Sequence, residues 1–176
     1  MKKTCIGFAL FLIIILTMAA CVITPKSDSY AEYLRIHIRA DSNGENAQAV
    51  KYKVKDAVVD YLTPFVAECD SKEKAKKMLD ERLTDVKSVA DKVLMEQGFD
   101  YRATVKLVAE NFPTRNYGDL TLEKGYYDAL IIELGSGKGD NWWCVVYPPL
   151  CFTGSGQRYI YKSKILEIIR NFSIKD

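Results

Sequence analysis

The strongest constraint on the fold lies in residues 141–152, which read Asn-Trp-Trp-Cys-Val-Val-Tyr-Pro-Pro-Leu-Cys-Phe. This stretch holds both tryptophans of the chain and two of its five cysteines. Aromatic rings contribute more apolar area than other side chains, and a pair of prolines stops a strand from continuing. We therefore expect a strand that ends in the core or at a recognition surface, with Trp142 and Trp143 pointing to opposite faces.

The first residues differ in kind from the rest. Lys2 and Lys3 precede an uncharged run whose centre, residues 8–16, is strongly apolar, and small residues follow at positions 19–20. This order is typical of a secretory signal peptide, while the run is also nearly long enough to stay as a membrane anchor. Cys21 directly after the small residues adds lipid attachment as a third outcome.

We expect residues 1–24 to be the signal peptide or anchor, residues 25–32 a linker and residues 33–176 a single globular domain with a core of its own. The whole chain has 25 basic and 23 acidic residues, and removal of residues 1–24 takes away two lysines and no acid. A nucleic-acid-binding domain usually carries a clustered basic excess. The balanced charge therefore predicts no nucleic-acid partner, and membrane contact through the export segment only.

Residues 34–40 alternate apolar and charged side chains, which predicts a strand with one buried face. The inward positions hold Leu34, Ile36 and Ile38. The outward positions form a cationic stripe of Arg35, His37 and Arg39. We expect this stripe to lie on the other, polar face of the strand.

Two amphipathic helices follow, because apolar residues recur at spacings of three and four across residues 47–65 and again across residues 75–94. Pro64 predicts that the first helix ends near Thr63, and Gly98 is a C-terminal cap for the second, which would be about seven turns long if unbroken. The expected N-terminal capping pairs are Ser42 with Glu45 and Asp70 with Glu73.

Three further strands and a helix complete the chain. Residues 101–107 alternate again, and residues 127–134 and 142–147 flank a glycine-rich loop, which predicts an antiparallel hairpin. A last helix is expected from about residue 162 to residue 171. The order predicts an α+β fold: a mostly antiparallel sheet with two helices from the N-terminal half and one C-terminal helix packed on it.

No motif predicts a cofactor, a metal site or catalytic residues. The glycine-rich loop has Asp140 where a dinucleotide fingerprint needs its third glycine, and Lys138 is not followed by the Ser or Thr of a P-loop. His37 is the only histidine, so a triad would have to use it. A pair of His37 with Cys144 or Cys151 would make an exported thiol-dependent hydrolase, whereas the simpler interpretation is a surface or hydrogen-bonding histidine.

Cys144 and Cys151 have six residues between them. Because export removes the chain from the reducing cytosol, a disulfide is the leading interpretation, with two buried free thiols as the alternative. Cys69, between the two predicted helices, is expected to have no partner within the monomer.

Several short runs resemble one known family. They are Leu-Arg-Ile-His-Ile at 34–38, Ala-Asp-Ser at 40–42, Phe-Pro-Thr at 112–114, Gly-Tyr-Tyr-Asp-Ala-Leu at 125–130 and, above all, residues 141–152. Together they closely resemble stage II sporulation protein R over nearly the whole expected domain. The resemblance implies a signalling protein without enzymatic activity, made in the forespore and exported into the intermembrane space, which triggers a septal membrane aspartic protease to process pro-sigma-E.

The resemblance supplies no contact residues, so the candidate partner-binding residues rest on chemistry. One set is the cationic stripe. The other is the exposed face of the aromatic segment, which offers Trp142, Trp143, Tyr147, Pro148, Pro149 and Phe152. An exported module that binds cell-wall glycan through the paired tryptophans is the remaining hypothesis.

Overall fold

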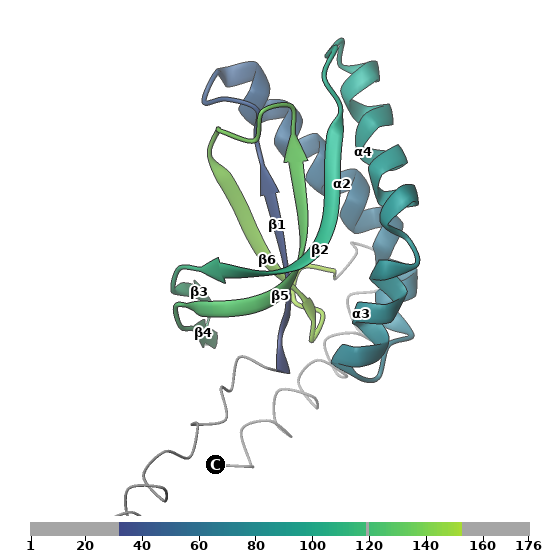
Figure 1. The fold of residues 1–176 in the computed structure, drawn as a ribbon, viewed down its shortest axis with the longest axis vertical. Coiled ribbons are helices and arrows are strands. Elements are labelled where there is room, and N and C mark those ends of the chain that lie inside the picture. Colours follow the sequence, from purple (N-terminus) through teal and green to yellow (C-terminus); the bar gives the residue numbers. More distant parts are fainter. Residues whose placement is uncertain (1–31, 119, 153–176) are drawn as a thin grey trace, which may run out of the picture.

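A computed structural model describes residues 32–118 and 120–152 of the chain (Figure 1). The expected export segment and the expected C-terminal helix lie outside these residues. Within the described part, no helix is both long and apolar enough to span a membrane.

A four-stranded sheet forms the centre of the fold, in the order β2-β5-β1-β6 (Figure 1). Its strands are β1 (Leu34–Arg39), β2 (Ala103–Phe112), β5 (Gly125–Leu134) and β6 (Asn141–Tyr147). β1 runs parallel to β5, while the β1–β6 and β2–β5 pairs are antiparallel. The α+β class is confirmed and the sheet is mixed. The predicted hairpin of β5 with β6 is wrong, because β1 lies between them.

The glycine-rich connection from β5 to β6 crosses the end of β1 and is held there by the turn that follows β1. The backbone N–H of Ser136 donates to the Asp41 carboxylate at 2.7 Å, and that of Gly139 donates to the Ala40 carbonyl at 2.8 Å. A Cβ added at Gly139 would lie 2.3 Å from the Ser42 carbonyl oxygen. The glycine is therefore required by close packing of two backbones.

Helices cover one face of the sheet in three pieces: α2 (Glu45–Ala67), α3 (Lys72–Asp80) and α4 (Leu83–Glu96). The second predicted helix is broken at Arg82, whose backbone N–H donates to the Leu79 carbonyl in a tight turn. The break places the Arg82 guanidinium 4.1 Å from the centre of the Phe65 ring on α2. The helical spacing does not reveal this interruption, which coincides with a tertiary contact between the two helices.

The predicted helix ends are corrected in part. α2 continues through Pro64 to Ala67, because Leu62 and Val66 on its last turns are buried in the core. Gly44, not Ser42, precedes α2, and Ser71, not Asp70, caps α3 by accepting from the Lys74 N–H. Gly98 has the expected positive φ of 77° after α4.

The sheet has a hydrophobic core on each face. The larger core lies between the sheet and the helices, and its strand residues include Leu34, Ile36 and Ile38, as predicted. β2 and β5 bend so that one end of this pair crosses over β1 and β6, with the small hairpin of β3 (Arg115–Tyr117) and β4 (Leu120–Leu122) at the tip (Figure 1). The second core lies under this bend and consists of Phe112, Leu122, Tyr127, Ala129, Ile131 and Val145.

Candidate functional site

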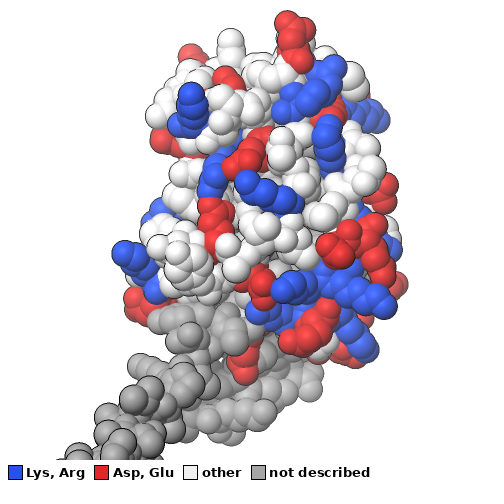
Figure 2. Space-filling model, viewed as in Figure 1, with Lys and Arg blue, Asp and Glu red and all other residues white. Residues whose placement is uncertain are grey.

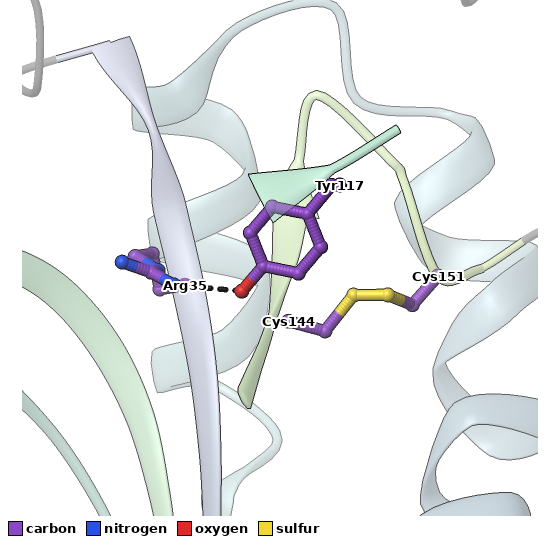
Figure 3. The surroundings of a disulfide bond; sticks show 4 residues. All are labelled: Arg35, Tyr117, Cys144 and Cys151. Carbon is purple, nitrogen blue, oxygen red and sulfur yellow. Dashed lines mark hydrogen bonds between the residues drawn. A yellow bond between two sulfur atoms is a disulfide. The ribbon is translucent and has the colours of Figure 1, made fainter. Parts of the chain in front are cut away.

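The cationic stripe of β1 lies on the face that the bend covers. Arg35 is 0% exposed and His37 is 5% exposed, whereas Arg39 stays partly exposed. The stripe lies on the face opposite Leu34, Ile36 and Ile38, as predicted, but its first two residues are covered. Alternation along one strand cannot reveal that a distant pair of strands folds back over it. Arg35 donates from Nη2 to the Tyr117 hydroxyl at 2.7 Å (Figure 3).

His37 is a hydrogen-bonding residue within this covered face. Its Nδ1 lies 3.1 Å from the Glu110 carboxylate and its Nε2 lies 2.8 Å from the Asn141 side-chain oxygen. The ring also stacks on Trp143, with 5.2 Å between centroids. Burial lowers the pKa of His37 to about 4, against the raising effect of the bond with Asn141. The simpler of the two interpretations of His37 holds.

Arg39 joins two carboxylates at the exposed margin of the same face. Its Nη1 lies 2.6 Å from Glu133, its Nη2 also contacts Glu110, and Lys106 lies 3.1 Å from the other oxygen of Glu133. Burial alone would raise the pKa of Glu133, but the bonds from Lys106 and Arg39 lower it overall. We call this set the polar network: His37, Arg39, Lys106, Glu110, Glu133 and Asn141. Figure 2 shows acidic and basic side chains interleaved on this face.

The two indoles point to opposite faces, as predicted. Trp142 packs against the core under the helices, and Trp143 packs against the second core. The Arg115 guanidinium lies 4.0 Å from the centre of the Trp143 ring, in addition to the stacked His37. A sugar would need this ring as an open platform, so the observed stacking gives the glycan hypothesis no support.

The end of the aromatic segment is mostly buried. Tyr147, Pro148, Pro149 and Phe152 are all buried, and the Tyr147 hydroxyl donates to the Asp70 carbonyl at 2.8 Å. Tyr147 and Phe152 belong to the core under the helices and so hold the end of β6 against the helix layer. Of the residues proposed for this surface, only Trp142 and Trp143 are partly exposed.

A disulfide joins Cys144 to Cys151, with 6.3 Å between the Cα atoms (Figure 3). Cys144 pairs with Ile36 in the strand register and belongs to the core under the helices, whereas His37 points to the other face. The structure therefore does not bring the proposed cysteine–histidine pair together. Within the described residues Cys69 forms no disulfide, and burial raises the pKa of its thiol.

The sequence patterns did not reveal the acidic and aromatic partners of the stripe. Glu133 had a usable signal, because it is an acid within the apolar run of a buried strand, where a charge normally has a partner. Glu110, Arg115 and Tyr117 gave none, since their positions depend on the bend of β2 and on the β3–β4 hairpin. Among the described residues, no group of three or more His, Cys, Asp or Glu is placed to hold a metal ion.

These features define a small α+β domain. Its charged side chains form the polar network, which lies beside the partly exposed Trp143 and Arg115. The family model for stage II sporulation protein R matches residues 30–157. The chain therefore belongs to the stage II sporulation protein R family and is a sporulation protein.

Stage II sporulation protein R of Bacillus subtilis (strain 168) is 35% identical over 119 residues. The match covers 68% of this chain and 53% of that relative, so the chain spans about half the length of the curated relative it matches. No solved structure shows a significant match.

Proposed function

We propose that this chain is an exported sporulation signal that activates a septal membrane aspartic protease and so triggers pro-sigma-E processing in the mother cell. Family membership supports the sporulation role. The Cys144–Cys151 disulfide suits a protein that leaves the reducing cytosol for the space between two membranes. In this proposal the protein acts by binding the protease and performs no chemistry itself.

The observation that carries the choice of binding surface is the arrangement around Trp143. This partly exposed indole lies under Arg115 and beside the polar network, and tryptophan and arginine are the residues that most often dominate binding energy at protein interfaces. We propose that the protease contacts this patch, which we define as Arg39, Lys106, Arg115 and Trp143 and call the Trp143 patch.

The outer faces of the helices differ from the Trp143 patch in the side chains they expose. They carry ion pairs between residues four positions apart: Lys87 with Asp91 and Lys92 with Glu96 on α4, and Lys74 of α3 with Asp70, which lies just before that helix. Such pairs are common on solvated helix surfaces and contribute little binding chemistry. We therefore assign the helix layer a structural role.

Reconstitution tests the proposal directly. Pro-sigma-E, the membrane protease and the exported protein are combined in vesicles, and cleavage of the pro-sequence is followed with and without the exported protein. We expect cleavage only when it is present on the extracytoplasmic side, and unprocessed pro-sigma-E in a strain that lacks the gene. Equal cleavage in its absence would refute the proposed activation.

A further inference from the structure

Arg35 is a buried cation without an acidic partner among the described residues. Its side chain is fully buried, and none of the ion pairs of this part of the chain includes it. Arg39, two residues further along the same strand, contacts both Glu110 and Glu133. A buried charge normally has a counter-charge, because an unpaired one is costly to remove from water. The distribution of acids on this face leaves Arg35 without one.

Aromatic rings and one hydroxyl surround the guanidinium instead. Its Cζ lies 4.2 Å from the centre of the Phe112 ring and 4.8 Å from that of Tyr127. The face of an aromatic ring attracts a cation, but the ring does not accept the hydrogen bonds that the N–H groups donate in the plane of the guanidinium. Nη2 donates to the Tyr117 hydroxyl, whereas Nε and Nη1 have no hydrogen-bond partner. The guanidinium can donate two parallel hydrogen bonds to a carboxylate, but here its one acceptor is a neutral hydroxyl oxygen.

The hydroxyl belongs to an element that is hydrogen-bonded separately from the main sheet. β3 and β4 form a two-stranded sheet of their own, outside the hydrogen-bonded ladder of the four-stranded sheet. At the base of this hairpin the Thr114 hydroxyl donates to Glu123 and accepts from the Lys124 N–H, both at 3.0 Å. A shift of the hairpin would leave the hydrogen bonds of the main sheet intact, but it would separate Leu122 from the second core. It would also move the Tyr117 hydroxyl away from the Arg35 guanidinium.

We propose that Arg35 is a carboxylate-binding site that takes an acidic side chain of a partner protein, with the β3–β4 hairpin as its movable cover. A carboxylate in the place of the Tyr117 hydroxyl would accept from Nη2 together with Nε or Nη1, the bidentate geometry that arginine favours. Arg115 on the same hairpin supplies a second, partly exposed cation that favours an acidic segment. The site holds for whichever protein supplies the carboxylate, so it does not depend on the proposed protease.

The test uses the full-length protein and nuclear magnetic resonance of the Arg35 Nε–H group, assigned by its loss in Arg35→Lys. The probes are the capped peptide acetyl-Gly-Glu-Gly-amide, its neutral Gln counterpart, and acetate. We expect a saturable shift with the Glu peptide and none with the Gln peptide. Tyr117→Phe should bind the Glu peptide about fivefold more tightly, because it removes one competing hydrogen bond. Tyr126→Phe, at a residue that is 73% exposed, is the matched control and should behave as the wild type.

Three results would overturn the proposal. The first is the absence of a saturable shift in both the wild type and Tyr117→Phe, and the second is equal affinity of these two proteins for the Glu peptide. The third is binding of acetate without binding of the Glu peptide, which would restrict the site to small free anions. If Arg35→Lys fails to fold, the Arg35 signal is assigned by its shift in Tyr117→Phe, which removes the hydroxyl bonded to the guanidinium and keeps the aromatic ring.

Discussion

Three cationic positions along β1 lie in three different environments. Arg35 lies among aromatic rings, His37 is hydrogen-bonded at both ring nitrogens, and Arg39 pairs with two carboxylates. Burial disfavours the charged form of an imidazole, whereas a guanidinium stays charged in any protein environment. The same face therefore holds one neutral ring, one charge balanced by acids and one charge without an acid among the described residues.

The histidine gives the first prediction. The pKa of His37 is about 4 in the folded protein, whereas the ordinary value of 6.5 applies to the unfolded chain. Above pH 6.5 the ring is neutral in both states, but at lower pH the unfolded chain takes up a proton that the folded chain does not. Stability is therefore full above this value and falls as the pH falls towards 4. Between pH 7 and pH 5 we expect a loss of about 2 kcal/mol.

Urea unfolding at pH 7 and pH 5 measures this loss, with His37→Gln as the comparison. The variant keeps a polar side chain but has no group that titrates in this range, so its unfolding free energy should change much less between the two pH values. Equal losses in the wild type and in His37→Gln would show that other groups cause the pH dependence.

Among the elements, the connection from β5 to β6 fixes which strands are neighbours. It passes over the end of β1, and its backbone touches the turn after β1 through Gly139. A connection of this kind lets β1 pair with both later strands at once. The glycine-rich run is thus explained by sheet order, and no bound phosphate is needed to account for it.

The close approach at Gly139 predicts a large effect of one methyl group. Gly139→Ala would place a Cβ 2.3 Å from a backbone oxygen, so the connection must shift, and we expect a loss of about 2 kcal/mol or more in unfolding free energy. Gly118→Ala is the control, because Gly118 has a φ of 64° but open space around it. That variant should lose only about 1 kcal/mol from backbone strain. Similar losses in both variants would contradict the packing argument.

The disulfide at the end of β6 predicts a dependence of stability on reductant, which two free thiols at Cys144 and Cys151 would not give. So short a loop contributes about 2 to 3 kcal/mol in the chain-entropy model. The unfolding free energy of the wild type should fall by this amount when reductant is added. The double variant Cys144→Ala/Cys151→Ala should be less stable from the start and indifferent to reductant. A wild type that does not respond to reductant would support two free thiols instead.

Local elements could be predicted from the sequence, but their arrangement could not. Period-two alternation identified β1 and the first part of β2, and helical spacing identified α2 and the α3–α4 region, since these patterns depend on neighbours in sequence. The position of β1 between β5 and β6 depends on pairings between residues 94 to 113 positions apart in the sequence. The break at Arg82 and the bend of β2 likewise involve tertiary contacts. The stripe was therefore found, whereas its acidic partners were missed.

In the whole molecule, the two faces of the sheet have different roles. The helices bury the larger core, so the helix side is committed to stability. The opposite face is only partly covered by the bend of β2 and β5, and its margin keeps the polar network and Trp143 within reach of a partner. Partner binding on this side would leave the helix layer undisturbed.

Charge reversal on each side tests this division. Arg115→Glu removes a cation from the Trp143 patch, and its stacking on a partly exposed ring contributes only about 1 kcal/mol, so the fold should persist. Lys92→Glu makes the same reversal on α4, where Lys92 is 74% exposed. In the reconstituted cleavage reaction we expect Arg115→Glu to lower protease activation at least tenfold, since an unfavourable charge at an interface costs several kcal/mol. Lys92→Glu should match the wild type, and the reverse order of effects would move the binding surface to the helix layer.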